Sequence, residues 1–159
     1  MAINVFDFLG HLQQERYRTV ILHATPEKSA ALTLFCQKIC KQTRGKYLDL
    51  LELFIHSKTL SEKIDRFNPE NLRSLFLEQS QAQALLIVDR VDFLLDTWRK
   101  SERQDFYRFL DKKWDGFTEN MKAKLVVCLQ TSLELESLQM VDSQKQNRIY
   151  RLTDFNDIV

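Results

Sequence analysis

Short apolar segments alternate along this chain with segments of helical periodicity, and this alternation limits its fold more than any other feature. Residues 19–24 (TVILHA), 84–89 (ALLIVD) and 124–132 (KLVVCLQTS) predict buried strands. Residues 46–54 (KYLDLLELF) predict a strand that continues into a helix or turn, and residues 148–152 (RIYRL) predict a last strand. Strands that alternate with helices need crossover connections, which give a mainly parallel sheet. We therefore predict a three-layer α/β fold with a mainly parallel five-stranded sheet, helices on both faces and no lid domain.

Apolar residues at helical spacing mark the buried faces of the helices. An amphipathic helix is predicted over about residues 3–16. A helix that follows the first strand should stop near Arg44-Gly45, and another should start at Asn68-Pro69-Glu70, which supplies a cap, a first-turn proline and an acid. The predicted buried faces of three helices consist of Val5, Phe8, Leu9 and Leu12; Leu32, Phe35, Cys36, Ile39 and Cys40; and Phe106, Phe109, Leu110, Trp114 and Phe117.

The length of 159 residues suits one globular domain. Hydrophobic residues make up 44% of the chain and charged residues 28%, which provides enough apolar surface for a core. Only three Gly and two Pro leave little room for long irregular loops. We predict a single domain over residues 1–159, in which an amphipathic helix (1–17) precedes an α/β core (18–159).

The sequence also predicts a cytoplasmic protein that has no contact with membranes. Three Cys residues without a secretory leader favour a reducing compartment. Apolar runs stay well short of the roughly 20 residues that a membrane-spanning helix needs. The net charge of +1 predicts no strong attraction to nucleic acid or to acidic membranes.

Polar side chains follow three predicted strands at the edge where open α/β sheets bind ligands. Thr25, Lys28 and Ser29 follow the first strand, Asp89 ends the central apolar strand, and Thr131 ends the strand after it. A lysine and a hydroxyl can hold phosphates and Mg²⁺, and an acid can hold Mg²⁺ or its water. The pattern predicts a nucleotide site formed by Thr25, Lys28, Ser29 and Thr131, in which Ser29 and Asp89 hold Mg²⁺.

With this constellation, the chain resembles the P-loop NTPases, in the arrangement that has an extra strand between the first strand and the strand ending in the acid. Within that class it is similar to the small single-domain P-loop proteins of bacterial BREX-type phage-defence systems. The order and length of KYLDLLELF, LLIVDRVDFLLD, VVCLQTS and RIYRL carry the resemblance, which covers most of the chain. It implies a P-loop NTPase-like domain, Mg-ATP as the cofactor if a nucleotide is bound, and a place among other protein subunits.

The first turn departs from the family pattern G-x-x-x-x-G-K-[ST] and resembles a degenerate Walker A motif. Glu27 stands where the second glycine is expected, and the turn is about two residues too short. Glycines allow the positive φ values with which such a loop closes its N–H groups on phosphates. The residues also suit a simple helix start, with Thr25 as cap, Pro26 at the first position and Glu27 at the positive end of the helix dipole. The sequence leaves both interpretations open.

The strand that ends at Asp89 lacks the catalytic glutamate that many ATPases of this class carry next. Arg90 occupies that position and cannot accept a proton from water. Asp92 is a candidate catalytic residue together with Asp89, but it also suits the start of a helix. Arg148 and Arg151 are expected at the surface, unless an oligomeric ATPase offers one of them across an interface.

Other chemically active residues fit structural roles. Cys36 and Cys40 lie on one helical face, but no further Cys or His pair completes a zinc site, so buried free cysteines are expected. His23 is expected in the core or at a strand end. The basic residues in 99–113 fit a solvated helix face, or else a contact with a nucleic-acid backbone.

Three functions follow, in order of preference. The first is a degenerate P-loop-like protein, with little or no enzymatic activity, that binds other proteins as a subunit or adaptor of a bacterial complex; anti-phage defence is the context that the resemblance implies. The second is an ATP-binding switch or slow Mg-dependent ATPase that works as a homo-oligomer. The third is an accessory factor that contacts DNA, directly or through the complex.

Overall fold

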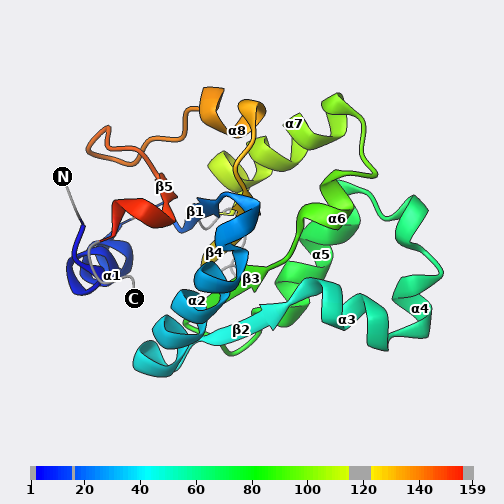
Figure 1. The fold of residues 1–159 in the computed structure, drawn as a ribbon, viewed down its shortest axis with the longest axis horizontal. Helices are drawn as coiled ribbons and strands as arrows, with labels where there is room; N and C mark the ends of the chain where they lie inside the picture. The colour runs from blue at the N-terminus through cyan, green and yellow to red at the C-terminus, as the bar shows by residue number, and fades with distance from the viewer. Residues whose placement is uncertain (1–2, 16, 115–122, 156–159) are drawn as a thin grey trace.

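A parallel five-stranded sheet forms the centre of the molecule (Figure 1). The computed structural model describes residues 3–15, 17–114 and 123–155. The strands lie in the order β2-β3-β4-β1-β5, so β4 separates β1 from β3, which is the arrangement that the resemblance implied. The strands are β1 (Thr19–Ala24), β2 (Lys46–Asp49), β3 (Leu85–Asp89), β4 (Lys124–Gln130) and β5 (Ile149–Arg151). Every pair of neighbours is parallel, and the predicted α/β fold is confirmed.

Helices cover both faces of the sheet. One face carries α1 (Val5–Gln14) and α2 (Ser29–Thr43); the other carries α5 (Pro69–Gln79), α7 (Lys100–Arg108) and the π-helical segment η3 (Phe109–Lys113). The shorter elements are η1 (Pro26–Lys28), α3 (Leu50–His56), α4 (Lys58–Ser61), η2 (Ile64–Arg66), α6 (Asp92–Leu95), α8 (Leu133–Ser137) and η4 (Leu152–Asp154). The sequence patterns did not predict α4 or α8, because one helical turn is too short to show periodicity. Within the described ranges, no helix is both long and apolar enough to cross a bilayer.

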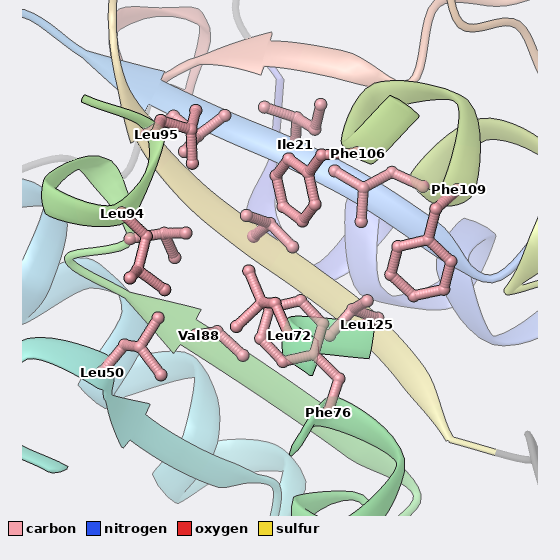
Figure 2. Close-up of a cluster of buried hydrophobic side chains, with 14 of the residues drawn as sticks. Ile21, Leu50, Leu72, Phe76, Val88, Leu94, Leu95, Phe106, Phe109 and Leu125 are labelled. Atoms are coloured by element: carbon pink, nitrogen blue, oxygen red, sulfur yellow. The ribbon is translucent and has the colours of Figure 1, made fainter. Parts of the chain in front are cut away.

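The larger core fills the space between the sheet and the layer of α5 and α7 (Figure 2). Phe76 of α5 packs against Trp114 edge to face, with ring centroids 6.4 Å apart, and against Phe109 at 6.5 Å. The buried indole N–H of Trp114 donates to the carbonyl of Ala123 at 2.9 Å, so this large side chain leaves no polar group without a partner. Phe117, predicted for the same buried face, lies outside the described residues.

A second core fills the space between the opposite face and α1 and α2. The ring of Phe8 in α1 lies 5.2 Å from those of Tyr150 and Phe155, and Phe155 in turn lies 4.9 Å from Phe35 of α2. The predicted apolar face of the N-terminal helix therefore packs within its own domain. Phe6, on the outer side of α1, remains 65% exposed.

The end of α2 and the start of α5 follow the sequence signals, with one difference at the end of α2. α2 stops where predicted, but Arg44 rather than Gly45 takes the left-handed conformation, with φ of 58°. Gly45 is needed for space instead, because a Cβ there would lie 3.2 Å from the Leu85 side chain. At the start of α5, the side chain of Asn68 accepts the N–H of Asn71 at 2.8 Å, which confirms the predicted cap.

Arg148 corrects one prediction, because it is buried rather than at the surface, with 2% of the residue exposed. Its guanidinium donates to the carbonyls of Val141 and Thr19, at 3.0 and 3.2 Å, and to the carboxylate of Asp111. The guanidinium also stacks on Tyr17, 4.6 Å from the ring centroid. The guanidinium of Arg148 therefore joins β1, Val141 and η3, and it is not available to a neighbouring subunit. The sequence suggests a surface position because Arg148 is charged, but its hydrogen bonds and its ion pair with Asp111 allow the charged side chain to be buried.

We predict that Arg148→Met lowers the free energy of unfolding by about 3 kcal/mol, because it leaves the carboxylate of Asp111 and several carbonyls without their donor. Arg151→Met, at the end of β5, is the matched control: the Arg151 side chain is 55% exposed and pairs with Glu136 at 3.1 Å. That surface pair contributes less than about 1 kcal/mol. Urea unfolding curves of both variants measure the difference, and equal losses would contradict the role given to Arg148.

Candidate functional site

Asp89 ends β3 on the face of the sheet that α2 covers. β3 and β4 pair Val88 with Val127, so Asp89 lies one position further along, beside Cys128. Side chains in a strand alternate between faces, and Cys128 belongs to the core under α2. Although Asp89 is a charged residue, only 4% of it is exposed. A carboxylate at such depth must find partners, because burial without them is costly.

Three donors bind the carboxylate of Asp89. The hydroxyls of Thr33 and Tyr47 donate to Oδ2 at 2.6 and 2.7 Å, and the N–H of Arg90 donates to Oδ1 at 2.9 Å. Burial, followed by the hydrogen bond to Asp89, raises the pKa of Tyr47 well above its usual range, so Tyr47 stays a donor. Sequence reasoning missed both hydroxyls, although Thr33 lies one helical turn after Ser29 and so shares its face.

A cavity of about 330 Å³ opens beside Asp89, and we call it the Asp89 cavity. Ser29, Asp89 and Asp92 line it together, so the structure brings these predicted site residues to one place. Asp96 is a third carboxylate on its wall. Ser29 and Asp89 offer a hydroxyl and a carboxylate that suit Mg²⁺. Arg90 lines the same cavity, so its guanidinium offsets part of the repulsion that the three acids exert on a polyphosphate.

Asp92 begins α6, as one of the two interpretations of its sequence position proposed. Its Oδ1 accepts the backbone N–H of Gln130 at 2.9 Å, which ties α6 to the end of β4. Burial, partly offset by the hydrogen bond from Gln130, raises the pKa of this carboxyl. A raised pKa suits a general base, but one of the two oxygens of Asp92 is already used to hold α6 in place.

Arg90 adopts a left-handed conformation, with φ of 59°. Such a backbone costs a non-glycine residue about 1 kcal/mol. The conformation directs the Arg90 guanidinium to Asp49 at the end of β2, 3.4 Å away. The position that carries a catalytic glutamate in many P-loop ATPases, the class that the sequence resembles, therefore holds a cation paired with Asp49 of the neighbouring strand.

The turn between β1 and α2 is compact. Residues 26–28 form the 3₁₀ turn η1, in which the N–H of Lys28 donates to the Thr25 carbonyl at 2.9 Å. Pro26 takes the predicted first position. The described non-glycine residues with positive φ are Arg44, Ala82, Arg90 and Lys145, and all lie outside this turn. The backbone therefore lacks the left-handed steps that curl a phosphate-binding loop around its ligand.

The side chain of Thr25 differs from the cap that the sequence predicted. It occupies the cap position but accepts no hydrogen bond from the backbone of η1. The backbone N–H of Glu27 itself and then the Thr25 hydroxyl lower the pKa of the Glu27 carboxyl, so this exposed group is negative at neutral pH.

Thr25, Lys28 and Thr131 line a separate cavity of about 270 Å³, which we call the Lys28 cavity. His23 also lines it, and its Nδ1 lies 2.8 Å from the Thr131 hydroxyl. Burial, followed by the positive charge of Arg151, lowers the pKa of His23 and keeps the ring neutral at pH 7. His23 is buried near the end of β1, which fits the expectation of a histidine in the core or at a strand end. The six predicted site residues thus divide between two cavities.

The cysteines are free and buried, as predicted. Cys36 Sγ of α2 lies 3.2 Å from Cys128 Sγ of β4, inside the second core. Burial raises the pKa of Cys40 to about 12, so its thiol stays protonated.

The positive charge of α7 is partly neutralised by ion pairs. Arg103 pairs with Glu134 at 2.7 Å, and Arg108 pairs with Asp105 at 2.7 Å.

Comparison of the chain with family models, curated proteins and solved structures found no match in any of the three. The geometry of the two cavities therefore carries the functional argument.

We predict that Asp89→Asn lowers the free energy of unfolding by about 1–3 kcal/mol, because an amide nitrogen cannot accept the hydrogen bonds that Thr33, Tyr47 or Arg90 donate. Asp96→Asn is the matched control on the wall of the same cavity, and its exposed side chain predicts a change within about 0.5 kcal/mol. Thermal and urea unfolding measure both variants. An Asp89→Asn protein as stable as the wild type would show that the three donors do not depend on the charge.

Proposed function

We propose that this chain is a degenerate P-loop-like domain that binds other proteins and has little or no nucleotide chemistry of its own. One observation carries the proposal: the residues that would hold a nucleotide are divided between the Asp89 cavity and the Lys28 cavity. A phosphate-binding loop needs its lysine, its hydroxyl and its acid to act on the same phosphates and Mg²⁺. Lys28 lines a different cavity from Ser29 and Asp89.

The hydrogen bonds of the site support this proposal. Asp89 already binds three donors within the protein, so Mg²⁺ would compete with Thr33 and Tyr47 for its oxygens. Arg90 stands in place of a general base and pairs with Asp49. These contacts stabilise the edge of the sheet and need no ligand for their explanation.

The resemblance described above suggests the class of partner. Small P-loop proteins of bacterial phage-defence systems act among other subunits, and we infer the same for this chain, with phage DNA reached through the complex. Exposed apolar side chains offer contact area: Phe6 of α1 and Leu34 of α2 are each 65% exposed, and Leu133 of α8 is 86% exposed. Exposed large apolar residues are common singly, so their role needs a direct test.

An ATP-binding switch is the second candidate, favoured by a different observation. The strand order β2-β3-β4-β1-β5 and the shared cavity of Ser29 and Asp89 keep the frame in which a Mg-nucleotide would bind. The exposed Lys28 side chain is flexible and long enough to turn towards phosphates at the start of α2. In this second proposal the chain works as an oligomer, with Arg151 rather than Arg148 as the arginine offered to a neighbour.

Calorimetric titration with Mg-ATP separates the two candidates. We expect no saturable heat and no thermal stabilisation at millimolar nucleotide, for the wild type and for Lys28→Ala alike. Lys28 is exposed and outside the cores, so its replacement should leave the fold intact. Micromolar binding that disappears in Lys28→Ala would overturn the proposal and favour the ATP-binding switch. Binding that survives in Lys28→Ala but is lost in Ser29→Ala would place the nucleotide in the Asp89 cavity without the lysine.

Partner binding is tested by expressing the tagged chain in the organism that naturally contains it, so that its natural partners are present. We expect the purified wild-type protein to carry stoichiometric amounts of at least one other subunit, seen as added mass in light scattering. Replacing the partner-facing apolar side chain should remove that subunit without lowering stability, and Phe6→Ser, Leu34→Ser and Leu133→Ser test the exposed residues one at a time. Gln13→Ser, exposed on α1, is the control. A wild-type monomer without a bound subunit would contradict the adaptor role.

A further inference from the structure

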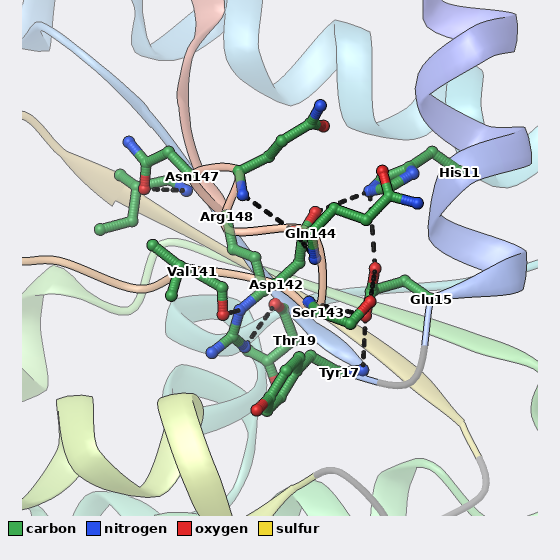
Figure 3. Close-up of polar contacts among 12 residues, drawn as sticks. His11, Glu15, Tyr17, Thr19, Val141, Asp142, Ser143, Gln144, Asn147 and Arg148 are labelled. Carbon is green, nitrogen blue, oxygen red and sulfur yellow. Dashed lines mark hydrogen bonds and ion pairs between the residues drawn. The ribbon is translucent and has the colours of Figure 1, made fainter.

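A cluster of His11, Glu15 and Asp142 lies away from both cavities, where α1 meets the segment before β5 (Figure 3). One side-chain atom from each residue lies within 4.8 Å of the other two. His11 Nε2 is 2.9 Å from Asp142 Oδ2 and 3.8 Å from Glu15 Oε2. The acids are deeply buried, with 5% and 1% of the side chains of Glu15 and Asp142 exposed, whereas that of His11 is 35% exposed.

Backbone groups fix the carboxylate of Asp142. Its Oδ1 accepts the N–H groups of Gln144 and Gln146, at 2.8 and 2.9 Å, which leaves Oδ2 directed at His11. These bonds lower the pKa of the Asp142 carboxyl against the opposing effect of burial, so the group is ionised at neutral pH. One oxygen is thus held in place by the chain and the other faces the imidazole.

Ser143 fixes the carboxylate of Glu15. The N–H of Ser143 donates to Oε1 at 3.3 Å and its hydroxyl donates to Oε2 at 3.0 Å. The N–H of Tyr17 also donates to Oε1, at 3.4 Å. Outer hydrogen bonds that orient the ligands in this way are a regular feature of protein metal sites.

The distances suit a metal ion bound by all three side chains. Metal bonds of about 2.0–2.2 Å to imidazole nitrogen and carboxylate oxygen place neighbouring ligand atoms about 3.0–3.4 Å apart. The observed 2.9 and 3.8 Å from His11 lie close to this range, and the oxygens of Glu15 and Asp142, which lie within 4.8 Å of each other, would move closer together on the ion. One imidazole and two carboxylates match divalent first-row ions such as Zn²⁺, Mn²⁺ and Fe²⁺, whereas Mg²⁺ and Ca²⁺ prefer oxygen ligands alone.

We propose that His11, Glu15 and Asp142 form a binding site for one divalent transition-metal ion that fastens α1 to residues 141–147. Binding uses the lone pair of His11 Nε2, so any proton shared between that atom and Asp142 Oδ2 leaves to solvent. Water fills the remaining coordination positions, because His11 also lines an open cavity of about 420 Å³ that contains Asp7 and Tyr150. The site is independent of any nucleotide.

Titration of the chelator-treated protein with Zn²⁺ and, separately, Mn²⁺ tests the proposal by calorimetry and thermal unfolding. We expect one ion per chain with at least one of the two metals, and a higher Tm with that metal. His11→Gln should weaken binding by about 100-fold or more, since it removes the nitrogen ligand while keeping a helix-compatible side chain. His56→Gln is the matched control, because His56 pairs with Glu52 across one turn of α3 at 2.9 Å but has no third acid.

Two results would overturn the metal site. The first is a wild-type protein that binds neither ion at millimolar concentration. The second is binding that His11→Gln leaves unchanged or that His56→Gln abolishes, which would place the ion elsewhere. Asp142→Asn adds a second ligand variant, and its circular dichroism spectrum shows whether the protein has folded before its metal affinity is compared. The d–d absorption of added Co²⁺ then reports on the coordination of the ion, and its intensity should change in His11→Gln but not in His56→Gln.

Discussion

The pairing of β4 between β1 and β3 is the constraint on which the rest of the structure depends. β1 pairs with β4 over its whole length, from Thr19 opposite Leu125 to Ala24 opposite Gln130. This register assigns every side chain of the central strands to one of two cores, because a shift by one residue would exchange the faces. It also assigns the polar strand ends: Asp89 belongs to the face under α2, whereas His23 bonds with Thr131 beside a separate cavity. The register thus sets the faces of the polar strand ends, whereas Thr25, Lys28 and Ser29 are placed by the turn and the helix that follow β1.

The turn after β1 shows how the rest of the site follows from a lack of glycine. A loop that surrounds phosphates needs residues with positive φ, which L side chains avoid. Thr25, Pro26 and Glu27 instead close a 3₁₀ turn that leads directly into α2. The first turn of α2 then brings Thr33 within reach of Asp89, and the hydroxyl of Thr33 takes a place on the acid that a Mg²⁺ ion would need. The short turn after β1 and the hydrogen-bonded state of the Asp89 carboxylate are therefore connected.

The fold was predictable to a greater extent than the site. The bounds of long apolar strands and of helices with clear periodicity were predicted within a few residues. A regular helix or strand with one buried face has apolar residues at a regular spacing, and this spacing is visible in the sequence. The predicted surface position of Arg148 was wrong, because no sequence pattern indicates its contacts with Val141, Thr19 and Asp111. These contacts join segments that are far apart in the chain. Tyr47 was missed for the same reason, since its bond to Asp89 depends on the pairing of β2 with β3. Residue type predicts which groups can react, whereas the register decides which groups meet.

Asp89 and Asp142 are both buried carboxylates held by donors, and the difference between them decides what each can do. Two hydroxyls use the lone pairs of Asp89 Oδ2, and a backbone N–H binds Oδ1, so the acid is engaged on both sides. Asp142 receives its backbone bonds on Oδ1, and Oδ2 faces an imidazole, which is a side chain able to bind a metal. A cation that enters the Asp89 cavity must break hydrogen bonds of the protein, whereas one that enters beside His11 replaces a proton. The position that sequence motifs favour for Mg²⁺ is therefore less prepared for an ion than one that no motif marks.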